Sequence, residues 1–295
     1  MNAPFKILHA IVRPVAGEPV FTVTKGDTIA IRPGAVVDGI AFDQETPVAW
    51  NDPRIGEDYA VMLIDGRPTA VLCADGVPPE AIGGFHYAPG WNAPARTGGR
   101  DVPRINPCSI WDAGFRPACP DPRGMALVEH AGLRFWCDIY LLGRDHLRDG
   151  TSRFGVEIAD GDALPQALDG QGRTAKLDYP TATAIYAHHG KQLLGAEEFF
   201  AAAYGVKERS AAGKDPKVTG RDAPRTSRFG IMQATGNLWV WGTDGDPDEP
   251  RPSLFGGSWL SGGDAGSRCA SLVSWPVFSI DDLSARGRSD HLTLE

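Results

Sequence analysis

The last 42 residues, 254–295, constrain the fold most, because their apolar side chains follow the period of neither a helix nor a strand. A buried helix repeats apolar residues about every 3.6 positions, and a half-buried strand repeats them at every second position. Here glycines, a proline and scattered polar residues interrupt both periods, which indicates irregular backbone held on a rigid frame. Binding surfaces commonly lie on such backbone, so the segment predicts a recognition surface. The side chains that follow no period are Ser258, Leu260, Ser261, Gly262, Asp264, Ser271, Val273, Ser274, Phe278, Ile280, Asp282 and Leu283.

The first quarter of the chain predicts short strands. Over residues 5–75, runs rich in β-branched and aromatic residues alternate with Gly, Pro and Asp, which is typical of a small antiparallel sandwich or barrel. From Gly83 on, Pro, Gly and aromatic residues follow without a period, so we expect a long connecting segment with a domain boundary around residues 85–100. The prediction is an α+β chain with a β-rich, sandwich-like domain over 1–90 and a second domain over 91–295.

The second domain mixes strands and helices. Residues 135–143 predict one buried strand, and two short helices follow over 181–190 and 195–205, each ending at a glycine. Residues 205–229 are polar and predict an exposed loop. The stretch over 230–242, GIMQATGNLWVWG, predicts a turn followed by a strand rich in tryptophan.

Composition excludes several classes of protein. The net charge is −8 without a block of Lys or Arg, so nucleic acid is not an expected partner. No stretch approaches the roughly 20 apolar residues of a membrane span, and the N-terminus does not resemble a signal peptide, so we expect neither membrane insertion nor ordinary secretion. The five cysteines are odd in number and form no CxxC pair, which argues against disulfides and zinc and favours folding in a reducing cytoplasm.

No metal, cofactor or catalytic residue is predicted. His188 and His189 are adjacent at a helix end and therefore point in different directions. Asp244, Asp246 and Asp248 alternate like the start of a calcium loop, but the glycine and the bidentate glutamate of such a loop are missing. The EPN and QPD tripeptides of calcium-dependent sugar-binding lectins are also absent.

Three segments taken together resemble the C-type lectin fold in its formylglycine-generating-enzyme-like branch. They are the helix pair over 184–205 joined by GKQLLG, the stretch GNLWVWG over 236–242, and LFGGSW with SRCA over 254–270. Five further segments are similar to the phage major tropism determinant family: 83–90, 111–125, 135–152, 188–193 and 285–295. The resemblance covers roughly residues 25–295 and implies a C-type lectin-like domain over 91–295 with a variable region over 254–295.

The resemblance also implies a function. Members of that family are receptor-binding proteins of phage tails, and a diversity-generating retroelement mutates their variable region. By resemblance, the variable positions are the twelve residues named above, with Leu260, Val273, Phe278, Ile280 and Leu283 as solvent-facing apolar anchors. The alternative is that these apolar side chains belong to the core. The partners implied are a host-cell receptor, expected to be a protein, and two further copies in a homotrimer.

The resemblance places the protein at the tail-fibre tip of a virion after folding in the cytoplasm; a bacterial or prophage-encoded surface protein is the alternative. An N-terminal β-prism domain of the family has no counterpart here, because strand-like residues begin almost at Met1. This departure makes attachment to a virion a weaker expectation than ligand binding.

The retroelement hypothesis can be checked against the residue types. Such elements mutate template adenines, and an AAC codon randomised at both adenines gives NNC, which encodes no Trp, Met, Lys, Gln or Glu. None of the twelve residues is one of these five types. The sequence is therefore compatible with diversification at these positions.

Two other functions stay open. The formylglycine-generating oxidase holds copper with a cysteine pair shortly after its GGS-aromatic motif, but here Cys269 stands alone and cannot form a two-sulfur site. The other alternative is a structural virion protein without a ligand.

Overall fold

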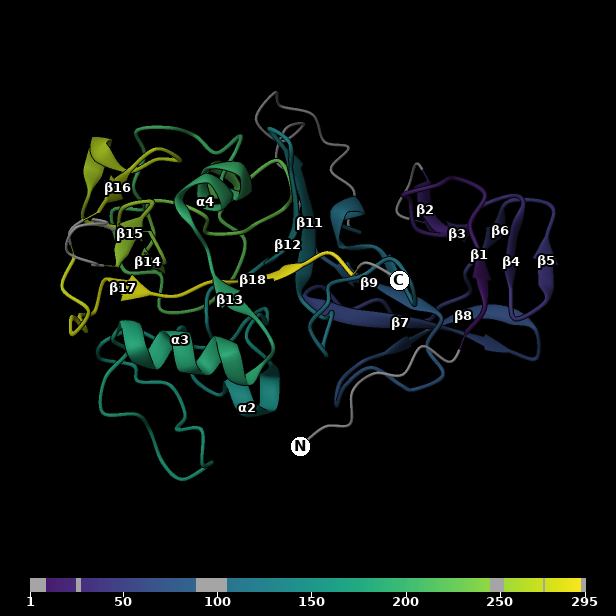
Figure 1. Cartoon of the computed structure of the whole chain (residues 1–295), viewed down its shortest axis with the longest axis horizontal. Helices are drawn as coiled ribbons and strands as arrows, with labels where there is room; N and C mark the ends of the chain where they lie inside the picture. Colours follow the sequence, from purple (N-terminus) through teal and green to yellow (C-terminus); the bar gives the residue numbers. More distant parts are fainter. Residues whose placement is uncertain (1–8, 25–27, 89–104, 245–251, 273, 293–295) are drawn as a thin grey trace.

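The computed structural model describes residues 9–24, 28–88, 105–244, 252–272 and 274–292. Figure 1 shows two lobes, with β1 to β8 at one end and the helices with β14 to β17 at the other. Strands outnumber helices in the described part of the chain, and the mixed α+β composition agrees with the class predicted from the sequence. Among the described residues, none of the helices has the length and apolar character needed to cross a bilayer.

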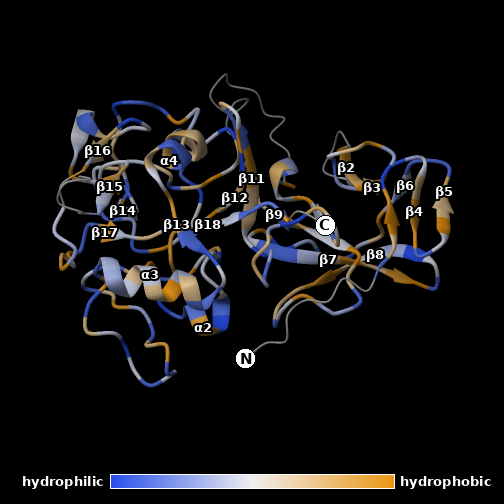
Figure 2. Ribbon diagram, viewed as in Figure 1, coloured by the Kyte–Doolittle hydropathy of each residue, from blue (hydrophilic) through white to orange (hydrophobic). Residues whose placement is uncertain are grey.

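The N-terminal lobe contains three antiparallel sheets with the strand orders β1-β4-β5, β2-β3-β6 and β10-β9-β7-β8. Their strands are β1 (Ile11–Val12), β2 (Phe21–Thr24), β3 (Thr28–Ile31), β4 (Ala35–Val37), β5 (Ile40–Phe42), β6 (Thr46–Pro47), β7 (Glu57–Ile64), β8 (Arg67–Leu72), β9 (Gly83–Tyr87) and β10 (Trp111–Asp112). Short apolar strands of this lobe, orange in Figure 2, bury their β-branched and aromatic side chains in one cluster. Ile105 and Ile110 join this cluster, so the N-terminal core includes residues beyond position 90.

Strand β9 corrects the prediction of an irregular segment from Gly83 onward. A Cβ on Gly83 would lie 2.4 Å from the carbonyl oxygen of Trp111, and one on Gly84 would lie 2.5 Å from that of Tyr59. Glycine is required because neighbouring backbone approaches closely on both sides. The two glycines therefore belong to an inner strand, although their sequence pattern is that of a loop.

The C-terminal lobe contains two more sheets, β11-β12-β18-β13 and β16-β15-β14-β17. Their strands are β11 (Met125–His130), β12 (Leu133–Asp138), β13 (Gln192–Leu193), β14 (Trp239–Gly242), β15 (Ser253–Phe255), β16 (Ala270–Ser271), β17 (Leu283–Ser284) and β18 (Gly287–Asp290). The helices of the described chain are η1 (Pro107–Ser109), α2 (His146–Asp149), α3 (Tyr179–His188), α4 (Ala196–Ala202), η2 (Ala223–Arg225) and η3 (Gly262–Asp264).

The two predicted helices are confirmed as α3 and α4, and local signals explain their limits. The side chain of Asp178 accepts a hydrogen bond from the Thr181 amide at 3.1 Å and caps α3, which ends just before Gly190 in the left-handed region at φ 68°. The Gly195 amide donates to the Glu198 carboxylate at 2.9 Å, which starts α4.

Buried charges hold the centre of the C-terminal lobe. Lys191 Nζ lies 2.6 Å from Asp138 Oδ1 and 2.8 Å from Thr151 Oγ1, and all three side chains are buried. The Arg286 side chain is 1% exposed and donates to four carbonyl oxygens, those of Asp138, Ile139, Met232 and Gln233, at 2.7–3.3 Å. One guanidinium therefore joins two separate segments of backbone.

Arg286 also explains why the buried strand predicted over 135–143 ends at Asp138. The Asp138 carbonyl accepts from the guanidinium, and the Ile139 carbonyl accepts from the guanidinium and from the Met232 amide, which lies outside the strands. The next three residues leave the sheet but stay fully buried. The apolar run therefore predicts burial correctly, but the strand predicted from it is too long.

Candidate binding surface

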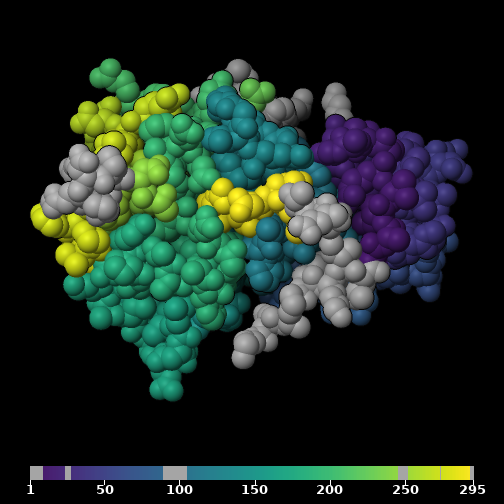
Figure 3. Space-filling view, in the orientation of Figure 1, coloured from purple at the N-terminus to yellow at the C-terminus, as the bar shows by residue number. Residues whose placement is uncertain are grey.

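Exposed apolar side chains gather on the segment that lacks a period. They are Leu260 (64% exposed), Leu272 (48%), Trp275 (51%), Val277 (59%), Phe278 (42%) and Ile280 (44%). We define the terminal surface as the exposed and half-exposed side chains of residues 260–264, 271–272 and 275–281. Figure 3 shows this part of the chain, in olive and yellow, at the end of the molecule farthest from the purple N-terminal strands. Large apolar groups so close together on a protein surface usually mark an interaction site.

Two glycines with left-handed backbone conformation precede the first part of the terminal surface, residues 260–264. Gly256 and Gly257 have φ values of 90° and 76°, a region that side chains disfavour. The Gly256 amide donates to the Cys269 carbonyl at 2.8 Å, and the Trp259 amide donates to the Asn237 carbonyl at 2.7 Å. The backbone below Leu260 is therefore irregular but fixed at both ends.

The segment 205–229, predicted to be an exposed loop, forms hydrogen bonds with residues 262–267, in and next to the first part of the terminal surface. The amides of Ser210 and Ala211 donate to the carbonyls of Ala265 and Gly262 at 3.2 and 3.1 Å. The carboxylate of Glu208 accepts hydrogen bonds from both the amide and the hydroxyl of Ser267. The segment has little regular structure, as predicted, but much of it packs against the frame of the terminal surface.

Residues 275–280 form the second part, which we call the recognition turn. The Phe278 amide donates to the Trp275 carbonyl at 3.1 Å and closes the turn. In Figure 1 it is the yellow loop that precedes β17, and its ribbon is partly orange in Figure 2. The turn is thus a short apolar projection at the end of the molecule.

Five of the twelve predicted variable residues are exposed and two are half-buried. The exposed residues are Leu260, Gly262, Asp264, Phe278 and Ile280, and the half-buried ones are Ser261 and Ser271. Val273 lies outside the described residues. Ser258, Ser274, Asp282 and Leu283 are buried, at 1%, 5%, 9% and 0% exposed.

The expectation that Leu283 faces solvent is wrong. Leu283 lies in β17, which pairs in parallel with β14 opposite Trp239, and its side chain packs in a cluster with Trp241 and Ala285. Both residues of β17 and their neighbours on either side are buried, so the Leu283 side chain lies inside the core whichever way the strand faces. For Leu283 the alternative of a core residue is the correct one.

The buried serines likewise do not present hydroxyls to solvent. Ser258 Oγ accepts the Leu260 amide at 3.3 Å, and the Ser258 amide donates to Ser261 Oγ at 2.9 Å. Ser274 Oγ lies 3.3 Å from Ser271 Oγ. These groups stabilise local turns within the terminal surface.

Leu283 and Ile280 provide a direct test of this division. We expect Leu283→Ala to lower the free energy of unfolding by about 2–4 kcal/mol, because it opens a cavity in the core. Ile280→Ala removes a similar side chain from the surface and should cost less than about 1 kcal/mol. Urea denaturation of both variants measures the difference, and equal losses would contradict the assignment of Leu283 to the core.

Three exposed residues of the terminal surface are not among the twelve predicted from the sequence. Leu272, Trp275 and Val277 are as exposed as Phe278 and Ile280, which were identified. The lack of helix or strand periodicity could have signalled these three residues, since they lie in the same aperiodic segment as the twelve.

Cys269 lacks the environment of a reactive thiol. It is half-buried and unpaired, and burial raises its pKa above the ordinary value for a cysteine. The thiolate is the form that attacks substrates and binds metals, so a raised pKa disfavours that chemistry.

The adjacent histidines His188 and His189 have different surroundings. His189 Nε2 lies 3.0 Å from Nδ1 of the buried His146, whose Nε2 lies 2.8 Å from the Gln166 carbonyl. A carbonyl only accepts, so His146 Nε2 donates to it. When both rings are neutral, His146 Nδ1 therefore accepts from His189 Nε2, and burial favours that neutral state. Burial lowers the pKa of His146 and lowers that of His189 to about 3, with nearby Lys191 acting in the same direction.

This histidine pair predicts a loss of stability in acid. Below the unfolded pKa of about 6.5, the unfolded chain binds protons that the folded chain excludes, so stability falls as pH falls from there toward 3. At pH 5 His189 should cost up to about 2 kcal/mol relative to pH 8. Replacing it, as His189→Asn, should shrink the difference in unfolding free energy between pH 8 and pH 5 by that amount. An unchanged pH dependence would contradict the neutral pair.

The candidate calcium loop is only partly visible. Asp246 and Asp248 lie outside the described residues, while the Asp244 carboxylate accepts a hydrogen bond from the Ala196 amide. Within the described ranges, no three His, Cys, Asp or Glu side chains are arranged to hold a metal ion.

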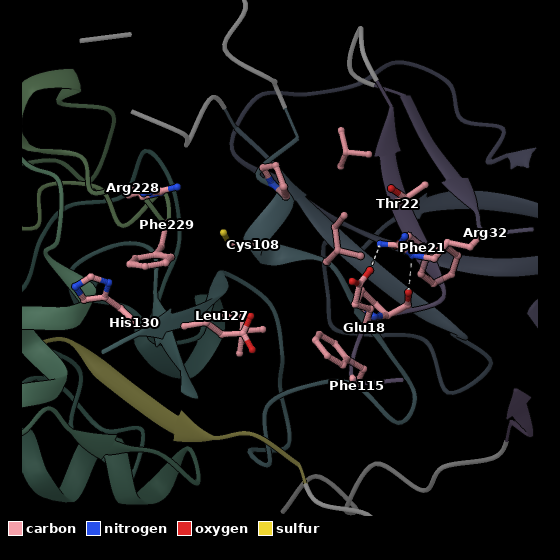
Figure 4. A pocket seen from close by; sticks show the side chains of 16 residues that line it. Glu18, Phe21, Thr22, Arg32, Cys108, Phe115, Leu127, His130, Arg228 and Phe229 are labelled. Carbon is pink, nitrogen blue, oxygen red and sulfur yellow. Dashed lines mark hydrogen bonds and ion pairs between the residues drawn. The ribbon is translucent and has the colours of Figure 1, made fainter. Parts of the chain in front are cut away.

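A cavity of about 790 Å³ lies between the lobes, away from the terminal surface (Figure 4). Phe21 and Arg32 line it from the N-terminal lobe, and Leu127, His130 and Phe229 line it from the other lobe. Arg32 is already paired with Glu18 at 2.8 Å, and burial raises the pKa of the lining thiol of Cys108 to about 12. Its described lining thus offers no activated nucleophile.

No protein-family model matches the chain. The chain is 37% identical, over 321 residues, to the tail fiber receptor-binding protein of Bordetella phage BPP-1, and the match covers 93% of this chain and 83% of that protein. Among solved structures it is similar to the Major Tropism Determinant U1 variant, with a TM-score of 0.86 and 36% identity over 97% of this chain and 86% of the other. The P3c variant matches with the same TM-score and coverage at 35% identity.

Proposed function

Because this chain belongs to the major tropism determinant family of phage receptor-binding proteins, we propose that its terminal surface binds a receptor on the host cell. The protein is a receptor-binding adhesin of a phage tail. The observation that carries the assignment of the site is the group of six exposed apolar side chains on a fixed, irregular backbone at one end of the molecule.

The mechanism is binding by a preformed surface. Hydrogen bonds from the frame hold the backbone in place, so little conformational entropy is lost when a receptor docks. Phe278, Ile280 and Leu260 supply apolar anchors, and Asp264 with the half-buried serines supplies polar contacts. The partner that fits is a protein receptor, since apolar contacts dominate.

The exposed members of the twelve residues are the positions that a retroelement diversifies. Their side chains leave the core untouched, so a change there alters contacts at little cost in stability. Sequencing the DNA downstream of the gene tests this. A near-copy of the last hundred or so bases, with adenines where the codons for residues 258–283 differ, should lie beside a reverse transcriptase. Absence of such a copy would mean that the surface is fixed.

The adhesin has no catalytic activity. The two-cysteine copper site of the formylglycine-generating oxidase has no counterpart at Cys269, whose raised pKa disfavours metal binding. Purified protein supplied with copper should therefore not oxidise thiols faster than copper alone.

The adhesin is a homotrimer located at the tail-fibre tip after folding in the cytoplasm. Three copies would multiply weak contacts into avidity. Light scattering should give about three times the chain mass of 31.5 kDa. Each lobe has a large hydrophobic cluster of its own, which supports a division into a β-rich domain over 1–90 and a C-type lectin-like domain over 91–295. Ile105 and Ile110 nevertheless join the N-terminal cluster, and a further cluster packs Ala60 and Cys73 against Leu127 and Trp136 across the two lobes.

Binding to bacteria tests the function itself. Fluorescently labelled protein should bind some members of a panel of bacterial strains in a saturable manner and be displaced by unlabelled protein. Treating the cells with protease should remove binding, whereas periodate, which oxidises glycans, should not. A structural virion protein without a ligand would bind no strain.

A further inference from the structure

Two exposed side chains of the recognition turn do not belong to the twelve variable positions. Trp275 is 51% exposed and Val277 is 59% exposed, more than Phe278 and Ile280 beside them. A tryptophan codon ends in G, so an AAC codon randomised at its adenines cannot produce Trp275. Val277 is different, because the valine codon GTC fits NNC, and only the resemblance that places the twelve variable positions sets it apart. The turn therefore combines variable positions with Trp275, which such diversification cannot produce, and with Val277 beside it.

Three hydrogen bonds from two other segments of the chain hold the recognition turn. The Tyr179 amide at the start of α3 donates to the Pro276 carbonyl at 3.0 Å, and the Leu177 amide donates to Ser279 Oγ at 2.9 Å. The Gly161 amide donates to the Ile280 carbonyl at 2.9 Å. A Cβ on Gly161 would lie 2.4 Å from the Ile280 nitrogen, so the contact requires glycine. The exposure of Trp275 and Val277 is thus set by the frame.

Exposing these two groups has no benefit for the isolated chain. Apolar surface removed from water gains about 25 cal/mol per Å², so a tryptophan left half in solvent forgoes part of that gain. Positions 271–280 carry no charged side chain in the sequence. The nearest charged residues along the chain are Arg268, Asp281 and Asp282, and the exposed Asp162 and Lys176 adjoin the residues that hold the turn. An apolar patch of a protein is the partner that such a turn fits.

We propose that Trp275 and Val277 form a constant apolar anchor that contacts an apolar patch of a protein receptor whatever side chains occupy the variable positions. The anchor supplies a share of the affinity common to all variants, and the exposed members of the twelve positions select the receptor. This inference rests on the proposed function, and its site is continuous with the proposed binding surface.

A library tests the anchor without knowledge of the natural receptor. The exposed members of the twelve positions are randomised in the full-length protein, displayed on yeast, and selected against purified lysozyme, serum albumin and streptavidin. Trp275→Ser and Val277→Ser are then introduced together into each selected binder. We expect the dissociation constant to rise at least tenfold in most binders, whatever their selected side chains. Val12→Ser is the matched control, since Val12 is also 59% exposed but lies in β1 of the other lobe, and it should change affinity less than twofold.

Each outcome is informative. Binders that keep their affinity after the double substitution, with an unchanged melting temperature, would overturn the constant anchor and leave the proposed function intact. A library that yields no binder would instead overturn the binding surface and the anchor with it. Losses confined to one selected sequence would show that the two residues act as specificity determinants, which also contradicts a constant role.

Discussion

Changing Phe278 and Ile280 together to serine should weaken binding to receptor-bearing cells by about 100-fold while leaving the fold intact. Each side chain is more than 40% exposed, so neither supplies much stability to the core. Two buried apolar anchors worth about 1.5 kcal/mol each at an interface account for a loss of this size. Titrating labelled protein on a strain that binds the wild type measures the affinity, and thermal unfolding measures the fold.

Two exposed isoleucines in the other lobe provide a control, because they distinguish loss of the binding site from loss of any exposed apolar side chain. Ile40 and Ile64 are 39% and 45% exposed and lie in β5 and β7 of the N-terminal lobe. Changing both to serine removes a similar apolar area and should leave cell binding within about twofold. If the two double variants lost binding equally, the terminal surface would not be the binding site.

Replacing Arg286 with methionine should lower the free energy of unfolding by about 3–5 kcal/mol. Methionine fills much of the space but donates no hydrogen bond, so four buried carbonyl oxygens lose the guanidinium, and within the described chain only that of Ile139 keeps a backbone donor, the Met232 amide. Those carbonyls belong to the end of β12 and to the segment before β14, which also carries the frame of the terminal surface. We therefore expect reduced binding as well as reduced stability. Urea denaturation gives the first quantity, and the cell titration gives the second.

Arg268 is the control for Arg286. Its exposed guanidinium lies 5.3 Å from the centre of the Phe200 ring, a contact worth about 0.5–1 kcal/mol. Arg268→Met should cost no more than that. The intermediate variant Arg286→Lys keeps the charge but not the planar fork, and should recover only part of the loss. A cost for Arg286→Met below about 1 kcal/mol would contradict its structural role.

Local signals explain which elements could be predicted. The helices α3 and α4 depend on caps, glycines and charges within a few residues, and all of these can be read in sequence order. Strand β9 was missed because its glycines serve contacts with Tyr59 and Trp111 on other strands. The segment over 139–142 was assigned to a strand because an apolar run reports burial, while the carbonyl partner, Arg286, comes late in the chain.

The sequence by itself indicated irregular backbone after residue 254, because the absence of a period is a local property, and the structure has such backbone between β15 and β17. The regular, largely buried strands β17 and β18 that follow were not indicated. The sequence also determined the family, through motifs whose order can be read directly. Only the tertiary structure decided which side chains reach solvent: Leu283 is buried because β17 pairs with β14, and Trp275 is exposed because α3 and Gly161 hold the turn away from the core. Burial depends on neighbours far away in the chain, and no local pattern contains them.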